Sequence, residues 1–276
     1  MTRFFFMICS ALLPVMFNAQ PNTYDIYALK FGERNNYIAM KDAAVGDRSG
    51  DSSRVFFMYW LLKGTNGKTI LVDAGFTEDA GTDPQQITFT APQKLLALVN
   101  VKPEEVTDII ITHPHWDHVG GIDLYPNAMA WMQEEDYHDF VTKKDPESCG
   151  FNQKDIQKVR DRNAKGSLRL IKGNDQAILP GIRVFTGSKH TAGSQFVLAS
   201  NAEKQSVIIA SDNCKYYRNA TRLLSSPATS DQKAYIRNLE IMRQLVKDPD
   251  LIVPGHDPLV FTKFKSVGAN VVQIKK

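Results

Sequence analysis

Hydrophobic residues in this chain gather in short runs, and polar segments rich in Gly, Asn, Asp and Pro separate the runs. Runs of this length, with many β-branched and aromatic residues, predict strands rather than helices. An Asn-Gly pair at residues 66–67 lies between two runs and favours a tight hairpin there. The segments predicted as strands are Tyr24–Leu29, Val55–Leu62, Thr69–Asp73, Asp108–Thr112, Ala128–Met132, Ile182–Thr186, Phe196–Ser200, Ser206–Ala210 and Asp250–Val253.

Two segments carry helical signals. Thr90 and Gln93 have the spacing of a capping box ahead of a helix over 94–100. A second helix is predicted to start after Asp231 as its cap and to end before Pro249. Its apolar residues recur at spacings of four, three and four, which is typical of a helical face packed on a core. These residues are Tyr235, Leu239, Met242 and Val246. Strands alternating with helices in both halves predict a layered α/β domain.

The stretch from residue 126 to residue 172 is polar and charged, above all at 133–139 and 152–165. These two parts are predicted as surface helices. Because the stretch follows the histidine motif described below, it is a candidate lid or substrate wall.

Composition narrows the class of protein. The chain has 276 residues, of which 43% are hydrophobic and 23% charged, as in globular proteins. These values exclude a disordered tail, a collagen-like repeat and a multi-span membrane protein. The formal net charge is only +3, and no Lys/Arg cluster occurs, so a nucleic-acid partner is not supported.

Met1–Ala19 has the layout of a secretory signal peptide: one Arg, an apolar run, and a small residue before a polar segment. We expect cleavage after Ala19, a mature domain over residues 20–276, and a periplasmic or secreted location. A buried N-terminal helix is the alternative. A membrane anchor is disfavoured, since Pro14 interrupts a run shorter than the ~20 residues that span a bilayer. No membrane association is expected after cleavage.

Two cysteines remain in the expected mature chain, Cys149 and Cys214. An oxidising compartment permits a disulfide between them, and two buried free thiols fit the sequence at least as well. No Cys-x-x-Cys pair occurs, so neither a thiolate zinc site nor thioredoxin-like chemistry is indicated.

Three of the six histidines lie within six positions, directly after the predicted strand Asp108–Thr112. Residues two apart on an extended segment point the same way, so His113 and His115 can share one metal ion. Asp117 and His118 follow where the next element begins and would face a second ion. Imidazole and carboxylate ligands suit Zn²⁺ and similar first-row ions.

Further ligand-type residues follow other predicted strands. His190 lies in a Gly/Ser/Thr loop, Asp212 ends the strand at 206–210, and His256 follows the last strand. Each alone is a weak signal, because a single His is more often structural. Together with the histidine cluster they predict a metal site. His138 falls outside this set and is interpreted as a surface residue.

In these motifs the chain resembles the metallo-β-lactamase-fold hydrolases, and Asp73, in Val-Asp-Ala-Gly, matches that family's early Asp. The resemblance covers residues 24–264. It implies a single α/β domain folded as a four-layer αβ/βα sandwich, with two metal ions at one edge between the sheets. It places His113, His115 and His190 on one ion, Asp117, His118 and His256 on the other, and Asp212 on both. It also implies that Asp73 orients a ligand without binding metal.

Within this family the chain looks most like the N-acyl-homoserine lactonases, the quorum-quenching enzymes, including their secreted AidC-type members. The resemblance implies two Zn²⁺ ions, with other first-row divalent ions as alternatives. It implies that a metal-bridging hydroxide attacks the carbonyl of a small lactone and that Asp117 passes a proton to the leaving alkoxide. A homodimer is compatible with this interpretation.

Two positions depart from the lactonase pattern. Ser194 stands where the family usually has a second His, which is not a metal ligand. Lys215 stands three residues after Asp212, where family lactonases often carry a Tyr directed at the substrate carbonyl. Tyr216 is the candidate for that catalytic role if the chain shifts by one residue; otherwise the role is empty.

Other functions stay open. A phosphotriesterase, a glyoxalase II-type thioesterase or a β-lactamase would use the same fold, although zinc β-lactamases usually lack the bridging Asp. A di-iron redox protein is disfavoured, because such members place a carboxylate where His115 stands and pair with flavin domains. A secreted metal-binding protein without catalysis is disfavoured, because structural zinc sites are normally closed by four protein ligands.

Aromatic and apolar residues near two of the strands are candidates for an acyl-chain groove. For any one of them, a place in the sheet core is the stronger expectation. They are Phe56, Phe57, Met58, Tyr59, Trp60 and Trp131.

Overall fold

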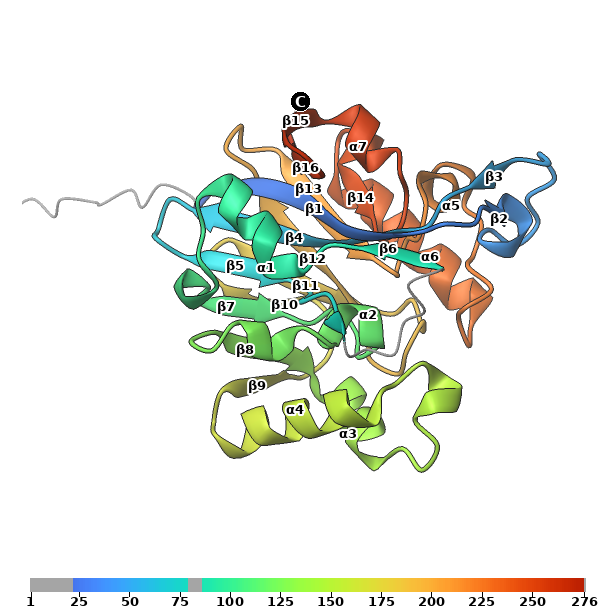
Figure 1. Ribbon diagram of the computed structural model, residues 1–276. Coiled ribbons are helices and arrows are strands. Elements are labelled where there is room, and N and C mark those ends of the chain that lie inside the picture. The colour runs from blue at the N-terminus through green and yellow to red at the C-terminus, as the bar shows by residue number, and fades with distance from the viewer. Residues whose placement is uncertain (1–21, 79–85, 276) are drawn as a thin grey trace, which may run out of the picture.

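The computed structural model describes residues 22–78 and 86–275, so the predicted signal peptide at 1–19 lies outside the described residues. A nine-stranded sheet and a five-stranded sheet form its centre (Figure 1). In spatial order the larger sheet contains β15 (Lys265–Gly268), β16 (Val271–Gln273), β1 (Tyr24–Arg34), β4 (Phe56–Gly64), β5 (Thr69–Val72), β7 (Asp108–Ile110), β8 (Met129–Gln133) and β9 (Leu168–Ile171), and β6 (Ile87–Phe89) pairs with β1. The smaller sheet contains β10 (Gln176–Leu179), β11 (Ile182–Thr186), β12 (Gln195–Ser200), β13 (Ser206–Ser211) and β14 (Ile252–Pro254).

A short separate hairpin, β2 (Ile38–Ala39) with β3 (Ser52–Ser53), projects beyond the sheets (Figure 1). The helices of the first half are α1 (Pro92–Leu96), α2 (Trp116–Val119), α3 (Glu134–Thr142) and α4 (Gln153–Ala164). Those of the second half are α5 (Tyr217–Arg222), α6 (Gln232–Leu245) and α7 (Val260–Lys263). No helix in the described ranges has the length and apolar character needed to cross a membrane.

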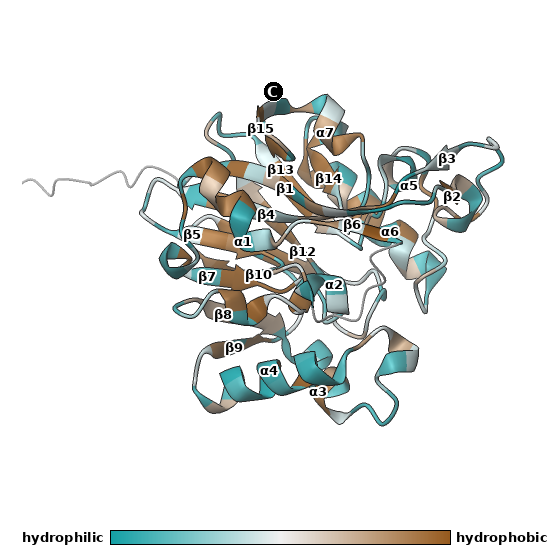
Figure 2. Ribbon diagram, viewed as in Figure 1, coloured by the Kyte–Doolittle hydropathy of each residue, from teal (hydrophilic) through white to brown (hydrophobic). Residues whose placement is uncertain are grey.

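Both faces of the larger sheet are buried, because alternate strand residues enter two different hydrophobic clusters. Trp60 of β4 packs with residues of the smaller sheet, whereas its neighbour Tyr59 packs with α1, α2, α3 and α4. Helices α5, α6 and α7 add to the cluster shared by the two sheets. Figure 2 shows apolar strands inside and hydrophilic outer surfaces on α3 and α4. The four-layer α/β sandwich is confirmed.

All nine predicted strands are present, with ends shifted by a few residues. The strand predicted at Asp250–Val253 starts at Ile252, after a 3-10 turn over Pro249–Leu251. The sequence does not predict the other strands of the described residues, each of which is only two to four residues long: β2, β3, β6, β9, β10, β15 and β16. The predicted hairpin joins β4 to β5.

The two predicted helices differ in outcome. The side chain of Asp231 accepts a hydrogen bond from Ala234 N at 2.9 Å, which confirms it as the cap of α6. The capping box at Thr90 is wrong, because the cap residue of α1 is Ala91, which makes no side-chain hydrogen bond, and the helix starts at Pro92. The fixed φ of Pro92 starts this helix instead.

The fold brings the candidate ligands to one edge. Strand β5 pairs in parallel with β7, and β13 pairs in parallel with β14. The carboxyl ends of parallel strands lie at the same edge, so the residues that follow these strands converge there. These residues are Asp73, His113, Asp212 and His256.

A buried arginine fastens α4 to the segment that follows α2. Arg162 donates hydrogen bonds to the carbonyl oxygens of Ala128, Ile122 and Tyr125 at 2.7, 2.7 and 2.8 Å. Arg162→Met is expected to lower the free energy of unfolding by about 3 kcal/mol or more, because three buried carbonyls lose a charged donor. Urea unfolding measures this. Arg169→Met, at an exposed position of β9, is the control and should stay within about 0.5 kcal/mol; equal midpoints for both variants would contradict the prediction.

Candidate metal centre

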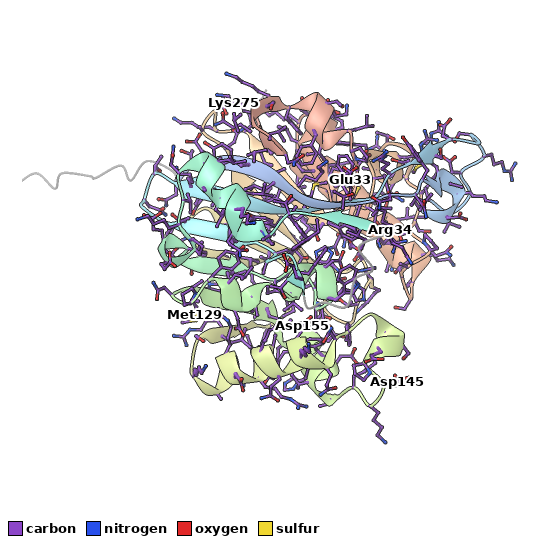
Figure 3. All side chains as sticks on the ribbon, viewed as in Figure 1. Glu33, Arg34, Met129, Asp145, Asp155 and Lys275 are labelled. Atoms are coloured by element: carbon purple, nitrogen blue, oxygen red, sulfur yellow. The ribbon has the colours of Figure 1, made fainter. Side chains whose placement is uncertain are left out.

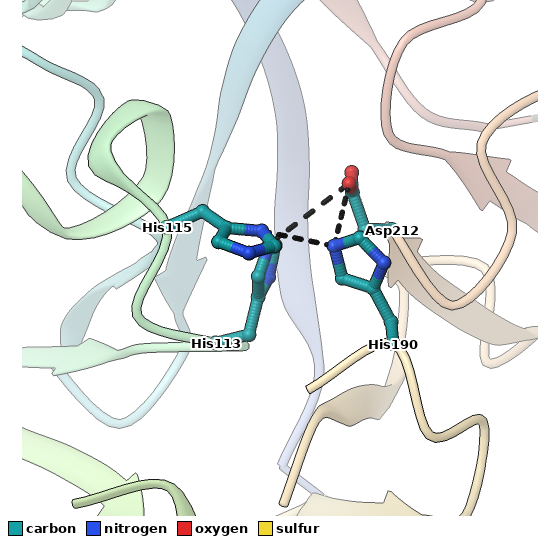
Figure 4. A group of neighbouring side chains, drawn as sticks. All are labelled: His113, His115, His190 and Asp212. Carbon is teal, nitrogen blue, oxygen red and sulfur yellow. Dashed lines mark hydrogen bonds and ion pairs between the residues drawn. The ribbon is translucent and has the colours of Figure 1, made fainter. Parts of the chain in front are cut away.

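The first ligand group unites three imidazoles and a carboxylate (Figure 4). His113 and His115 come from the segment between β7 and α2, and His190 comes from the loop between β11 and β12. His190 Nε2 lies 3.0 Å from His115 Nδ1 and 3.0 Å from Asp212 Oδ2. His113 Nε2 lies 3.9 Å from the same carboxylate oxygen. The four ligand atoms lie within 4.8 Å of one another, which suits one divalent ion.

The second ligand group lies on the other side of Asp212. Asp117 and His118 are on α2, and His256 lies two residues after the end of β14; their ligand atoms also lie within 4.8 Å of one another. His118 Nε2 is 3.6 Å and His256 Nε2 2.7 Å from Asp212 Oδ1. The two oxygens of Asp212 therefore face different ligand groups, which is the arrangement of a bridging carboxylate.

Unpaired polar atoms show that metal ions fit these residues. Among the described residues, His113 Nε2, His118 Nε2 and Asp212 Oδ1 are buried without a hydrogen-bond partner. Buried polar atoms are normally satisfied, so a cluster of exceptions requires an explanation. All three atoms point into the two ligand groups, where metal ions would satisfy them.

The protonation states of His113, His115 and Asp212 agree with this fit, because metal ions bind neutral imidazoles and ionised carboxylates. His118 differs: burial opposes its protonation, but Asp117 and Asp73 hold its pKa well above the usual value. Burial, with the neighbouring His190, lowers the pKa of His115 to about 3, and burial lowers that of His113 well below its usual value. Burial opposes ionisation of Asp212, but Lys215 and His256 hold its pKa well below the usual range.

Outer partners fix the orientation of the imidazoles. His256 Nδ1 faces the carbonyl oxygen of Phe56 at 2.8 Å, and His190 Nδ1 faces that of Ala228 at 2.5 Å. Each carbonyl turns Nε2 of its histidine toward the metal site. His115 differs, because its Nδ1 is the atom that faces the other ligands.

Asp73 is fully buried next to His118 of the second ligand group, and four polar atoms lie within hydrogen-bond distance of its carboxylate. Its Oδ1 accepts from Thr112 N at 2.8 Å, and its Oδ2 lies near Thr112 Oγ1, Ser211 Oγ and His118 Nδ1 at 2.9, 3.0 and 2.8 Å. Its backbone is left-handed, with φ of 63°, which Asp tolerates better than most residues. Asp73 thus joins the segments after β5, β7 and β13 and orients the His118 ring.

A buried carboxylate holds the loop that carries His190. Asp136, on α3, accepts hydrogen bonds from Gly193 N at 2.7 Å and Thr191 Oγ1 at 2.9 Å. Burial raises the pKa of Asp136 to about 7, which these two bonds only partly offset. The loop is therefore held by a group that ionises near neutral pH.

Asp136 should make stability depend on pH. The unfolded chain loses this proton near pH 4, and the folded chain keeps it until about pH 7. The folded state binds more protons in this window, so the stability contributed by Asp136 falls as pH rises from about 4 to about 7. As the pH rises through this window, the free energy of unfolding of Asp136→Asn should increase relative to that of the wild type by up to about 4 kcal/mol. Thermal unfolding at pH 4.5 and 8 measures it, with the exposed Asp175→Asn as control; a difference that stays constant with pH would contradict it.

The metal ligands open into a cavity of about 400 Å³, which is within the range of small-molecule sites. Arg34, the last residue of β1 and labelled in Figure 3, is one of its lining residues. Its apolar lining includes Ile38, Val55, Phe57 and Trp116. One end of the cavity is therefore polar and metal-binding, and another wall is apolar.

The polar stretch at 126–172 forms surface helices as predicted, but it is not the main wall of the cavity. Only Gly150 of that stretch lines the cavity. Residues 34–57, which include the β2–β3 hairpin, provide a larger share. The histidine motif gives no indication of this wall, because residues 34–57 lie far before the motif in the sequence.

Residues just after Asp212 hold this wall in place. Arg218 Nη1 lies 3.0 Å from Asp47 Oδ2, and Asn219 Nδ2 donates to Ala43 O at 3.1 Å. Tyr216 lines the cavity, but its hydroxyl donates to the carbonyl oxygen of Arg54 at 3.2 Å, and its side chain is buried. Its catalytic role stays a prediction.

The other candidates have structural places. Of the suggested groove residues only Phe57 lines the cavity; Met58, Tyr59 and Trp60 are buried in the hydrophobic clusters, and Phe56 and Trp131 pack against the one that contains Trp60. Cys149 and Cys214 are free thiols. His138 is exposed on α3, as predicted.

A two-sheet sandwich with two groups of His and Asp ligands at one edge defines a metal-dependent hydrolase. The family model described as the metallo-beta-lactamase superfamily matches residues 58–256. The chain belongs to this superfamily and is related to N-acyl homoserine lactonases.

Three relatives illustrate this relationship. The N-acyl homoserine lactonase of Bacillus cereus is 24% identical over 213 residues, which cover 72% of this chain and 80% of that protein. A B. thuringiensis AiiA mutant with bound N-decanoyl-L-homoserine has a TM-score of 0.69 at 20% identity, covering 89% of this chain and 98% of that one. AidC, a dizinc quorum-quenching lactonase, has a TM-score of 0.62 at 15% identity, covering 92% and 98%. The two solved structures show a shared fold.

Proposed function

We propose that this protein is a dinuclear metal-dependent lactonase that opens the ring of N-acyl-homoserine lactones. The observation that carries the proposal is Asp212, whose two oxygens face two separate ligand groups. The named lactonase relatives supply the substrate class. The apolar cavity wall beside the ligands is suited to an acyl chain.

The proposed metals are two Zn²⁺ ions, one held by His113, His115, His190 and Asp212, the other by Asp117, His118, His256 and Asp212. When bound, such a pair lowers the pKa of water to about 7 and polarises an ester carbonyl. The imidazoles are already oriented for this by their outer partners.

The chain's own residues would position the substrate and move a proton. Asp117 lines the cavity, and its Oδ2 lies 3.3 Å from His118 Nε2. Burial opposes its ionisation, but His118 holds its pKa well below the usual range. As the oxygen of water joins the carbonyl carbon and the ring C–O bond breaks, Asp117 would deliver the proton of that water to the ring oxygen.

A substrate panel tests the proposal. N-hexanoyl-homoserine lactone, a β-lactam and a phosphotriester are offered to the purified protein with and without a chelator, and acid release is followed. Fast, chelator-sensitive opening of the lactone alone is the expected result. If the protein binds two metal equivalents but hydrolyses a different substrate, the lactonase proposal is wrong and another hydrolase activity on this fold takes its place.

We also propose export of the protein, on the signal-like composition of Met1–Ala19. Mass spectrometry of the protein made in a Gram-negative host should find a chain starting at Gln20 in the periplasm or medium. An intact N-terminus in the cytoplasm would contradict it.

A further inference from the structure

Two charged residues of the cavity lining remain once the metal ligands and their contacts are assigned. Asp117 and Asp212 belong to the ligand groups, and Lys215 Nζ lies 2.8 Å from Asp212 Oδ2. The remaining charged lining residues are Arg34 and Asp42. Neither of these two side chains makes a hydrogen bond or an ion pair with another residue in the described part of the chain. Both groups are therefore open to a ligand in the cavity.

The backbone fixes the place of Arg34. Its N–H donates to Val55 O at 2.9 Å, and it pairs with β6 at the end of β1. The preceding residue, Glu33, points to the other face of the strand, where it binds Arg54. Burial raises the pKa of the Tyr216 hydroxyl, and the charge of Arg34 opposes this rise. Arg34 therefore lies on the side of the cavity that Tyr216 lines.

A short turn fixes the place of Asp42, which is the last residue of the 3-10 turn that starts at Met40. The carbonyl oxygen of Met40 accepts from Ala43 N and Ala44 N at 3.1 and 2.8 Å. Asn219 of α5 donates to Ala43 O at 3.1 Å. The exposed side chain of Asp42 thus starts from a backbone that the second half of the chain holds beside the cavity.

Together the two groups complement a neutral secondary amide. A guanidinium only donates hydrogen bonds, and a carboxylate only accepts them. A secondary amide offers one carbonyl acceptor and one N–H donor, so it can use both groups. A carboxylate ligand would be repelled by Asp42, and an amine would be repelled by Arg34. In an N-acyl lactone the amide lies between the ring, which has to reach the metal ligands, and the acyl chain, which suits the apolar wall.

We propose that Arg34 and Asp42 recognise the amide of the substrate: the guanidinium of Arg34 donates to the amide carbonyl, and the carboxylate of Asp42 accepts from the amide N–H. This rests on the proposed function and deepens it, because the pair distinguishes N-acyl-homoserine lactones from simple alkyl lactones. The amide is unchanged by the reaction, so these contacts act on the bound substrate and the transition state alike. Their loss should raise KM and leave kcat nearly unchanged.

The test uses the metal-loaded protein and two lactones, N-hexanoyl-homoserine lactone and α-heptyl-γ-butyrolactone, in which two methylenes replace the amide. Arg34→Met and Asp42→Ala should each raise KM for the amide lactone by about 10-fold, because a hydrogen bond to a charged group is lost at an exposed position. The KM for the alkyl lactone should change far less. The control is Arg48→Met, at an exposed arginine of the same segment that does not line the cavity, and it should change neither KM.

The outcomes separate this inference from the proposed function. Equal changes on both lactones would overturn it, because the variants would then alter only the shape of the cavity, and wild-type KM values on both would overturn it as well. If the wild type opens neither lactone, calorimetry with the two ring-opened acids decides. Weaker binding of the amide-containing acid alone in Arg34→Met would leave the amide contact standing while the lactonase proposal fails. Unchanged binding of both acids would overturn the two proposals together.

Discussion

An Asp212→Asn variant is expected to bind at most one metal equivalent instead of two and to lose nearly all hydrolytic activity. The amide keeps the shape of the carboxylate, but its nitrogen is not a metal ligand, so one ligand group loses its oxygen. Loss of an outer partner of a metal ligand alone costs about 10- to 100-fold in affinity. Loss of a ligand atom itself should exceed this.

Elemental analysis of the purified variant measures the metal content, and thermal unfolding with zinc and with chelator gives a second measurement. Zinc that binds only the folded state raises the unfolding temperature, and this increase should shrink in the variant. Asp175→Asn, an exposed partner of Arg183, is the control. Two bound equivalents with full activity in Asp212→Asn would exclude a bridging role.

Replacement of Asp73 is expected to weaken metal binding without removing any metal ligand. In Asp73→Asn the left-handed backbone is kept, but one acceptor oxygen becomes a donor facing His118 Nδ1. We expect a loss of about 10- to 100-fold in zinc affinity. Asp73→Ala should in addition lose about 1–3 kcal/mol of stability, because the buried Thr112 N–H is left without an acceptor.

Competition with a chelator gives the zinc affinities, and urea unfolding of the metal-free protein gives the stabilities. Asn100→Ala is the matched control for backbone strain, because Asn100 is exposed and has a similar φ of 54°. Wild-type zinc affinity in both Asp73 variants would show that the carboxylate only joins the strands.

Much of the metal site follows from local sequence. His113, His115, Asp117 and His118 lie within six residues after one buried strand, so their proximity needs little tertiary information. The longer strands are predicted well, because runs of β-branched residues that are buried on both faces are compatible with few other kinds of secondary structure. Strands such as β9 escape prediction because they are only a few residues long and provide too short an apolar pattern.

The cavity wall could not be predicted, because it depends on long-range packing. Residues 34–57 are held beside the ligands by residues distant in the sequence, among them Arg218 and Asn219 of α5, which contact Asp47 and Ala43. The region predicted as a lid instead packs its apolar face on the larger sheet, where Phe140 and Ile156 are buried.

A layered α/β domain and the residue types available for metal binding can both be predicted from short sequence patterns, because the physical requirement of each pattern is local. Only the packing of the two sheets shows that the two oxygens of Asp212 face different ligand groups and that Asp73 orients His118. These relations join residues far apart in the chain, and only the packing of two sheets against each other sets their distances.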